Sequence, residues 1–461
     1  MKQVTNHQSV KQIICLLLTS MLLPMSALAD NGTSNYDQLK PFGFCTQSSR
    51  TTNSPYNITG GGCYEYPVTG VASNKVITLT STGKDMKNTI SNAINNYNVI
   101  IFDGSQGDFI VASTISLNSL SGKTLLGINR ARICTTWYAT QEILDALDAA
   151  GVPNMKTSSG TGGTLSNGRS VSEEAEYNTR QIIINMTGDT KESYRNSGIF
   201  FFRDCKNIII RNLKFVGPGS IDVSGSDLLS FYGTKNSWVD HCDFTDGMDG
   251  NFDITQKADF NTVSWCTFSY TERSYMHQNT NLIGSSDSEA TGYLNTTFAF
   301  NHWGDNCRAR MPMARVGKIH MINNYYTCST GSSCINPRNY SEFLIEGNYL
   351  TGVKSCYSQT NATAVTWTSN NYTDGKPIPQ SFGSTVNVPY EYTVADCNLV
   401  PEEVSTYAGA TLYLQTQPTK VKAIDNAPDD YSQDSSYNLI GQRVDSNVKG
   451  IVICNHKLIV R

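Results

Sequence analysis

A chain of 461 residues is long enough for one large domain or two ordinary ones. Only 16% of its residues are charged and 39% are hydrophobic, a balance that favours strands and turns over helices. The formal net charge of −4 at pH 7 gives no support for a nucleic-acid partner, so an acidic ligand would have to be bound by a local basic patch.

Residues 1–29 have the pattern of a signal peptide. Two lysines supply a basic start, residues 13–23 form an apolar stretch too short to span a bilayer, and residues 27–29 match the small-residue cleavage pattern. We therefore expect a secreted protein in the medium, at the cell surface or in the periplasm, without membrane insertion. An uncleaved anchor is the alternative.

Short elements follow in chain order. Apolar residues that recur on one face predict a helix over residues 84–97. Residues 141–150 form a second predicted helix, and the Gly/Ser/Thr-rich stretch 156–172 is expected to be a surface loop. Short apolar strands separated by polar turns are expected at 99–102, 109–111 and 124–128.

From residue 206 onward the chain repeats one shape, a short strand that ends in a large apolar residue. Six such segments end at residues 215, 244, 268, 303, 326 and 350, so the steps are 29, 24, 35, 23 and 24 residues. A basic step of 23–24 residues with insertions predicts a solenoid whose coils stack through parallel strands. The six segments are Ile210–Phe215, Val239–Phe244, Val263–Phe268, Phe298–Trp303, Met321–Tyr326 and Ile345–Leu350.

The position two places before each of these last residues is expected to form a stack inside the solenoid, one strand spacing of about 4.8 Å apart. Asn301, Asn324 and Asn348 occupy it in successive segments, which predicts an amide ladder; the alternative is that Asn is merely common in turns. Cys242 and Cys266 occupy the same position, and we expect them to stack as free thiols because parallel neighbours seldom have disulfide geometry.

The chain has 13 Cys, of which 12 remain after the signal peptide is lost, and an even number permits disulfides in an exported protein. Cys328 and Cys334 flank a five-residue turn and are one candidate pair; Cys45 and Cys63 are a second. No Cys-x-x-Cys pair occurs, so zinc is not expected.

The end of the chain changes character. We assign residues 30–410 to the solenoid domain and residues 411–436, which lack the repeat, to a linker. Residues 437–461 have a compact hairpin-like pattern with Gly441 and Gly450 as turn residues, and are predicted to form a small C-terminal module.

Several common catalytic motifs are absent from the sequence. None of the five His that remain after the signal peptide lies in a HExxH motif, and no GxSxG elbow or P-loop occurs. Ser-His chemistry and zinc chemistry therefore have no obvious carriers.

A group of carboxylates and a group of arginines are present instead. Asp227, Asp249 and Asp253 lie on neighbouring coils, and three oxygen donors are what a hard cation such as Ca²⁺ prefers, although turn carboxylates are usually only solvated. Arg308, Arg310 and Arg315 follow one or two coils later, around a proline that stiffens the backbone. Planar guanidinium groups suit a carboxylate-bearing polymer; a solvated turn is the alternative.

Ordered motifs run through the chain from about residue 42 to residue 410. They are IIFDGS at 100–105, KTLLGI at 123–128, WVDH at 238–241, DGNFDI at 249–254, TVSW at 262–265, LIGSSD at 282–287, the run RMPMARVGKIHMINNYY at 310–326, and EGNY at 346–349. In these motifs the chain resembles the pectate lyases, polysaccharide lyase family 1. The resemblance implies a right-handed parallel β-helix, Ca²⁺ as cofactor, and β-elimination on α-1,4-polygalacturonate; we also expect a monomer.

The resemblance also implies roles for individual residues. Asp227, Asp249 and Asp253 match the family's Ca²⁺ ligands. Arg310 matches the catalytic base that removes the C5 proton beside the uronate carboxyl, and Arg315 matches a substrate-binding arginine. Free Arg is protonated at ordinary pH, so the base role requires an unusual environment.

One position departs from the family pattern. Asn279 stands where the family has a substrate-binding Lys, and we assign it to the substrate site together with Arg308 and Arg315. His277, Arg273 or Arg308 are the candidates to supply the missing donor. A further family metal ligand, two residues before the first Asp, is Gly225 here.

Three other functions remain to be weighed. A pectin lyase acts on methylated substrate without Ca²⁺, so the carboxylate cluster argues against it. A polygalacturonase would hydrolyse with paired carboxylates, but its GHG segment is missing. A non-catalytic pectin-binding β-helix is kept open by Asn279.

Overall fold

The computed structural model describes residues 40–152, 164–221 and 225–413, together with strand residues 436–437, 443–444, 451–454 and 457–460. The chain divides into two compact units, Met1–Leu414 and Gln415–Arg461. The predicted signal peptide and most of the predicted linker lie outside the described residues. Among the residues described, no helix is long and apolar enough to cross a membrane.

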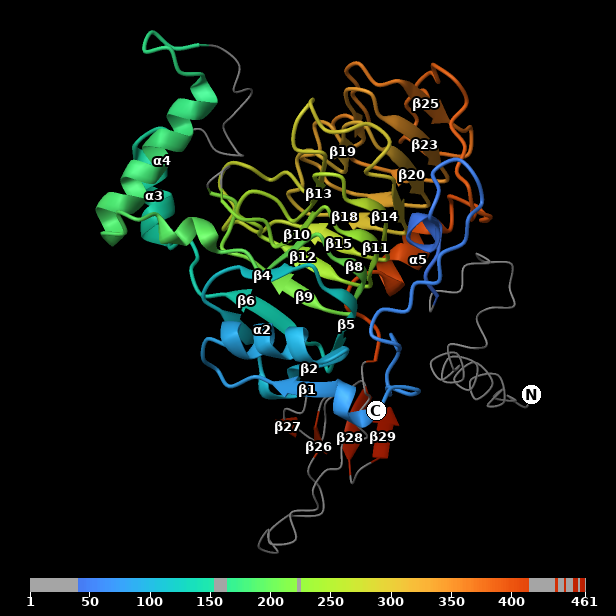
Figure 1. Ribbon diagram of the computed structural model, residues 1–461. Helices are drawn as coiled ribbons and strands as arrows, with labels where there is room; N and C mark the ends of the chain where they lie inside the picture. Colours follow the sequence, from blue (N-terminus) through green and yellow to red (C-terminus); the bar gives the residue numbers. More distant parts are fainter. Residues whose placement is uncertain are drawn as a thin grey trace, which may run out of the picture. The chain divides into compact units, whose positions relative to one another are not determined.

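Three parallel sheets build the first unit (Figure 1). The first, with ten strands, consists in spatial order of β1 (Val76–Thr80), β2 (Val99–Asp103), β5 (Ser121–Ile128), β8 (Lys206–Arg211), β11 (Lys235–Asp240), β14 (Asp259–Ser264), β17 (Thr296–Ala299), β20 (Lys318–Ile322), β23 (Glu342–Glu346) and β25 (Ala364–Trp367). Neighbours in this sheet lie one coil apart in the sequence, so the chain winds as a parallel β-helix, as predicted.

The coils between the two ends of the stack add one strand to each of the other two sheets. The seven-stranded sheet consists of β22 (Asn336–Pro337), β19 (Met313–Ala314), β16 (Leu282–Ile283), β13 (Phe252–Thr255), β10 (Leu229–Tyr232), β7 (Phe200–Arg203) and β4 (Ile115–Asn118). The eight-stranded sheet consists of β24 (Tyr349–Leu350), β21 (Tyr325–Tyr326), β18 (His302–Trp303), β15 (Thr267–Ser269), β12 (Asp243–Thr245), β9 (Lys214–Val216), β6 (Arg132–Thr135) and β3 (Phe109–Val111).

The six repeated segments stack in the predicted register. Their last residues are paired across the eight-stranded sheet, from Phe215 through Phe244 and onward to Leu350. The aromatic rings among them stack face to face inside the coils, with centroids 4.7–5.5 Å apart. This apolar column forms the centre of the core.

The predicted Asn ladder is present and is longer than expected. The Asn301 side chain donates to Asn324 Oδ1 (3.0 Å), Asn324 donates to Asn348 Oδ1 (2.9 Å), and Asn348 donates to Asn371 Oδ1 (3.0 Å). The side-chain oxygens also accept from the backbone N–H groups of the preceding coil's Asn residues. Every one of these buried amides therefore connects one coil to the next.

Cysteine pairing agrees with the sequence prediction only in part. Cys242 and Cys266 are buried, adjacent and free, as predicted. Cys328 and Cys334 are also free, so the disulfide considered between them is wrong in this structure, although their thiols are hydrogen-bonded. The pairing of Cys45 with Cys63 is wrong as well, because the Cys45 thiol donates to the Phe42 carbonyl oxygen (3.1 Å) and the Cys63 thiol to that of Glu65 (3.5 Å).

The helices lie outside the coil stack. α2 (Lys87–Asn96) and α3 (Gln141–Ala149) confirm the two predicted helices, and α2 covers the first coil with buried Ile90 and Ile94. The sequence analysis missed α5 (Val400–Tyr407) and α4 (Val171–Thr187). Within the predicted loop over 156–172, residues 164–168 are exposed and α4 begins at Val171.

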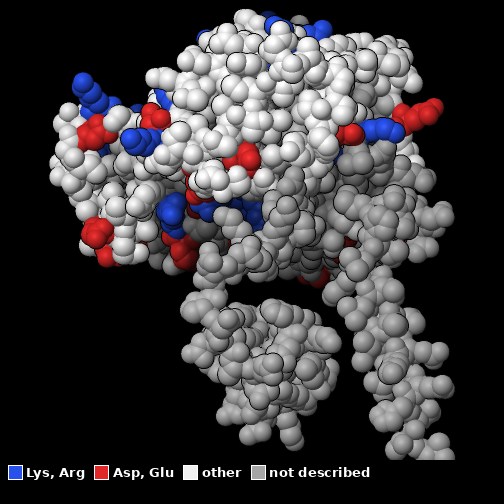
Figure 2. Space-filling model, turned by 90° about the horizontal axis from the view of Figure 1, so that it is seen from below, with Lys and Arg blue, Asp and Glu red and all other residues white. Residues whose placement is uncertain are grey.

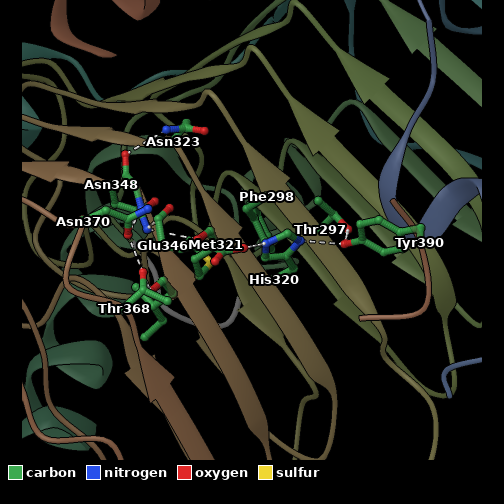
Figure 3. Close-up of polar contacts among 12 residues, drawn as sticks. Thr297, Phe298, His320, Met321, Asn323, Glu346, Asn348, Thr368, Asn370 and Tyr390 are labelled. Carbon is green, nitrogen blue, oxygen red and sulfur yellow. Dashed lines mark hydrogen bonds and ion pairs between the residues drawn. The ribbon is translucent and has the colours of Figure 1, made fainter. Parts of the chain in front are cut away.

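A buried polar network fastens the end of this unit to the ten-stranded sheet (Figure 3). His320 Nδ1 lies 2.8 Å from Tyr390 Oη, which is also 2.7 Å from Thr297 Oγ1. On its other side, His320 Nε2 lies 2.9 Å from Glu346 Oε1. Because Thr297, His320 and Glu346 stand on three successive strands, Tyr390 holds the segment after β25 against the sheet.

The second unit contains a four-stranded antiparallel sheet. Its strands are β26 (Ser436–Tyr437), β27 (Arg443–Val444), β28 (Ile451–Cys454) and β29 (Lys457–Val460), and β28 pairs with β29 as a hairpin. Antiparallel pairing distinguishes this unit from the parallel stack and is consistent with a separate C-terminal module.

Candidate active site

The predicted site residues lie along one edge of the seven-stranded sheet. Asp227 precedes β10, Asp253 lies in β13, Asn279 precedes β16, and Arg310 precedes β19. These strands are neighbours, and residue 279 is bridged to Ala309 in parallel register. The repeat therefore brings together side chains that are up to 83 positions apart in the sequence.

Two carboxylates share a small space above Gly250. A Cβ atom placed on Gly250 would lie 2.9 Å from Asp227 Oδ1 and 3.1 Å from Asp253 Oδ1, so only glycine leaves both oxygens room. Ser230 donates to Asp227 Oδ2 (2.9 Å), and the Leu282 N–H donates to Asp253 Oδ1 (3.0 Å). Asp227 Oδ1 is buried and has no hydrogen-bond partner.

Electrostatics at this pair disfavour uncompensated negative charge. Burial raises the pKa of Asp227, and the Arg310 guanidinium opposes that shift. Burial and the neighbouring Asp227 charge raise the pKa of Asp253 well above its usual value, again opposed by Arg310. Two half-buried carboxylates with a buried, unpartnered oxygen have the oxygen-only chemistry that suits a hard divalent cation such as Ca²⁺.

The third predicted carboxylate has a different partner in the structure. Asp249 Oδ1 lies 3.3 Å from His277 Nδ1, and that nitrogen is 2.7 Å from the Asp249 carbonyl oxygen. The other nitrogen of His277 is 2.7 Å from Asn279 Nδ2. Within the described residues no three His, Cys, Asp or Glu side chains are grouped as a ready metal cluster, so a ligand role for Asp249 stays a prediction.

Arg310 is positioned by its backbone. Its φ of 59° lies in the left-handed region, which costs a non-glycine residue about 1–2 kcal/mol, so the surroundings must hold it there. The preceding coil does so, because the Asn281 N–H and the Thr280 hydroxyl both donate to the Arg310 carbonyl (2.7 Å and 2.5 Å). The side chain is half-buried and acts electrostatically on Asp227 and Asp253.

The other two arginines flank this position. Arg315 Nε donates to Asp287 (2.8 Å) and its Nη1 donates to Gly284 O (2.9 Å), so its side chain is anchored from the coil before. Asp287 is 63% exposed, which leaves this ion pair open to exchange with another carboxylate. Arg308 is half-buried, and its N–H donates to Gln278 O (2.9 Å).

Tyr270 belongs to the site but was missed by the sequence analysis. Its buried hydroxyl donates to the Asn279 carbonyl oxygen (2.6 Å), and burial raises its pKa well above the usual value. It fixes the backbone at the position where this chain departs from the family pattern. No motif or periodicity singles it out, because it simply follows a strand end.

Charged side chains are sparse on the face drawn in Figure 2, where small blue and red groups are scattered over a mostly uncharged surface. No broad basic area covers the described residues visible there.

Comparisons with known proteins agree with this architecture. The family model described as "Pectate lyase" matches residues 154–412, more than half of the chain. Probable pectate lyase A of Aspergillus niger is 33% identical over 221 residues, which cover 46% of this chain and 64% of that protein. Probable pectate lyase B of Aspergillus terreus is 28% identical over 336 residues, covering 66% and 93%.

Solved structures are more distant. A mutant pectate lyase from Bacillus subtilis covers 83% of this chain and 99% of its own, at 19% identity and a TM-score of 0.48. The chain spans just under two thirds of the length of the first Aspergillus relative. On the strength of the family match across more than half of its length, the chain belongs to the pectate lyase family.

Proposed function

We propose that this protein is a secreted pectate lyase that cleaves α-1,4-polygalacturonate by Ca²⁺-dependent β-elimination and leaves 4,5-unsaturated oligogalacturonides. Family membership supports the reaction class. The single observation that carries the site is the pair of half-buried carboxylates, Asp227 and Asp253, beside Gly250 and within the field of Arg310.

Asp227 and Asp253 would hold the metal. Asp249 would be a third ligand once its carboxylate had rotated away from His277. Bound there, Ca²⁺ would act as a Lewis acid that neutralises the uronate carboxylate and acidifies the neighbouring C5–H. The unpartnered Asp227 Oδ1 supports this role, since an oxygen that lacks a protein donor is available to a cation.

Arg310 would take the proton from C5. The electron pair of the C5–H bond then forms the C4=C5 double bond, and the C4–O4 bond breaks to release the next sugar. A cation held by Asp227 and Asp253 beside Arg310 would supply the unusual environment that the base role requires. Arg315 would hold the uronate carboxylate by exchanging its exposed partner Asp287 for substrate.

Asn279 and Arg308 would line the same subsite. Asn279 is engaged by His277, so this pair offers an amide and an imidazole where the family has a Lys. The uncharged amide of Asn279 cannot attract a uronate as strongly as an ammonium, which predicts weaker binding of fully de-esterified substrate at this position.

One assay tests the proposal. The protein is incubated with polygalacturonate and with methylated pectin, with and without a chelator, while the ultraviolet absorbance of the unsaturated uronide is followed. We expect chelator-sensitive activity on polygalacturonate. Activity that survives the chelator and requires methylation would make it a pectin lyase, and binding without any absorbance change would make it a non-catalytic pectin-binding protein.

A further inference from the structure

A cavity of about 450 Å³ lies outside the carboxylate–arginine site. Its polar lining includes hydroxyl groups of Ser113 and Ser193 and the amide of Asn196, and its aromatic lining includes Trp137 and Tyr194. These residues belong to the excursion between β6 and β7, which carries α3 and α4, and to the coil just before β4. Figure 1 shows the two helices at one side of the coil stack.

The cavity continues the edge that carries the catalytic candidates. Ser113 precedes β4, Asn196 precedes β7 and Asp227 precedes β10, and these three strands are consecutive neighbours in one sheet. The Ser226 N–H donates to the Arg195 carbonyl oxygen (2.8 Å), which joins the two coils directly. A strand spacing of about 4.8 Å puts the cavity one to two coils from the carboxylate pair.

The aromatic pair gives the cavity a flat apolar wall. The rings of Trp137 and Tyr194 have centroids 5.0 Å apart and an interplanar angle of 34°. Tyr194 is buried, whereas Trp137 is half-buried and lines the cavity. An aromatic face bordered by hydroxyl and amide groups suits a sugar ring, whose C–H face is apolar and whose edge carries hydrogen-bonding groups.

Charge decides which sugar fits. Asp189 is the one ionisable acid or base, other than Tyr194, among the described residues that line the cavity. Asp189 Oδ2 accepts hydrogen bonds from Ser193 Oγ (2.7 Å) and from the Tyr194 N–H (3.2 Å). The hydrogen bond from Ser193 is the main cause of the lowered pKa of Asp189. Lys87 is not one of the lining residues, and its Nζ donates a hydrogen bond to the Ser113 hydroxyl (2.6 Å). A uronate would therefore meet a carboxylate without a guanidinium to compensate it.

We propose that this cavity is a subsite for an uncharged pyranose unit of pectin, bound one to two coils from the cleavage site. The choice of pectin as the ligand rests on the proposed function, whereas binding of the sugar in the cavity does not depend on catalysis. The uncharged ring is either a methyl-esterified galacturonate of the main chain or a neutral sugar of a side chain. The subsite would direct the enzyme to pectin that is only partly de-esterified.

Tryptophan fluorescence offers a direct readout. The chain has five Trp, and the other four are at most 7% exposed, so a ligand in the cavity would perturb Trp137 selectively. The full-length protein is titrated, in the presence of a chelator, with fully methyl-esterified trigalacturonate, with a neutral galacto-oligosaccharide and with free trigalacturonate. We expect saturable binding of at least one uncharged probe and weaker binding of free trigalacturonate.

Variants separate the subsite from the catalytic centre. Trp137→Ala should weaken binding of the uncharged probe by about tenfold or more, measured by calorimetry because the fluorophore is lost, whereas Trp137→Phe retains an aromatic wall and should retain most of the affinity. Asp189→Asn keeps an acceptor for Ser193 and Tyr194 and should improve binding of free trigalacturonate by about fivefold. Asp253→Ala should leave the binding of the uncharged probe unchanged.

Each outcome decides a separate point. Binding of the methyl ester alone assigns the main chain as the source, and binding of the galacto-oligosaccharide alone assigns a side chain. Absence of saturable binding, equal affinity for free trigalacturonate, or a folded Trp137→Ala protein with unchanged affinity would overturn the subsite. Binding with no lyase activity would refute only the proposed function, whereas lyase activity with no binding would refute only the subsite.

Discussion

Arg310 combines an unusual backbone conformation with a position beside two carboxylates, and both features bear on how replaceable it is. Arg310→Lys keeps the charge but loses the planar reach of the guanidinium. We expect kcat on polygalacturonate to fall about 10²–10⁴-fold, the usual cost of losing a general base. Wild-type activity should rise towards alkaline pH, because a deprotonated base is needed. Steady-state kinetics between neutral and alkaline pH measures both effects.

Arg315→Lys is the matched comparison. Its guanidinium is anchored by Gly284 O and Asp287 at two different nitrogens, and one ammonium cannot reproduce that geometry. Since its proposed role is to hold the substrate carboxylate, we expect KM to rise as well as kcat to fall. An Arg310→Lys protein with near-normal kcat would contradict the base assignment.

Asp253 offers a test of metal binding that does not depend on the base. Asp253→Ala removes one of the two oxygens beside Gly250, so lyase activity should disappear at low Ca²⁺ and return partly with excess metal. The fold should persist, because the substitution also relieves the repulsion that raises the pKa of Asp253. Asp305→Ala, which removes an exposed carboxylate that does not belong to the predicted ligand set, is the control and should leave the Ca²⁺ requirement unchanged. Full chelator-sensitive activity in Asp253→Ala would mean that the ligand set is wrong.

At the scale of the structural element, the Asn ladder stabilises the later coils by connecting each one to the next. Asn324→Ala would remove four hydrogen bonds, those of the Asn324 side chain with the Asn301 N–H, the Asn301 side-chain amide, Asn348 Oδ1 and Phe298 O. Asn348 Oδ1 keeps the backbone N–H of residue 324, and the Asn301 side-chain amide keeps Val263 O, whereas the Asn301 N–H loses the acceptor that it has here. A buried polar group left unpaired costs about 1–3 kcal/mol and each further lost hydrogen bond about 0.5–1.5 kcal/mol, so we expect a loss of roughly 3–5 kcal/mol, measured as a lower unfolding midpoint. Asn370→Ala, at an exposed residue that accepts hydrogen bonds from the Gly347 N–H and the Thr368 hydroxyl, should cost only about 1 kcal/mol, because water can replace both partners.

The coil repeat was predictable because stacking imposes it on the sequence. Each coil must present a large apolar residue at the same point, so the six segment ends can be aligned by their spacing alone, and all six align in the sheet. Helix α4 was missed although it begins with a capping box at Ser170 and Glu173 and ends at Gly188 in the left-handed region. Its apolar periodicity is weak, and the preceding Gly/Ser/Thr-rich stretch favoured a loop.

The site was predictable only in part. The identities of Asp227, Asp253 and Arg310 follow from family motifs, but the approach of the two carboxylates above Gly250 depends on how three coils stack. The engagement of Asp249 with His277 and of Asn279 with Tyr270 has no sequence signal, because side-chain orientation within a coil is set by packing. The same holds for the Trp137 cavity, whose walls come from segments far apart in the sequence.

For the molecule as a whole, two buried groups should give opposite dependences of stability on pH. Burial lowers the pKa of His302 to about 4, so its contribution is present above the unfolded value of 6.5 and is lost as the pH falls towards 4. At about 1.4 kcal/mol per pKa unit, that loss amounts to roughly 3 kcal/mol. His302→Gln should therefore flatten the decline of the melting temperature between about pH 7 and pH 4.

Asp259 has the opposite sign and serves as the comparison. Burial raises its pKa to about 6, so the stability that it contributes is present below the unfolded value of 3.8 and is lost as the pH rises through 6. Asp259→Asn keeps an acceptor for Asn295 and for the Phe260 N–H, and should raise the melting temperature near pH 7. A fall at pH 7, or identical pH profiles for the two variants, would show that these groups do not control the response.

Removal of residues 415–461 tests the division of the chain. Because Met1–Leu414 forms a compact unit by itself, the shortened protein should keep its melting temperature and its lyase activity on soluble polygalacturonate. Loss of activity in the shortened protein would assign the C-terminal unit a part in catalysis.

The excursion between β6 and β7 has a consequence for engineering. More than 60 residues between β6 and β7 lie outside the coil stack, yet the strand register is kept, because Ile115 pairs with Phe200 and Ile133 with Phe215. Loop length costs little once both ends are fixed by a rigid register. This point of the coil is therefore a natural graft site for a foreign binding loop or a small domain. The insert would have to keep the hydrogen bond from the Ser226 N–H to the Arg195 carbonyl oxygen and the packing against Met248 and Tyr275, because these contacts join the excursion to the coils of the proposed site.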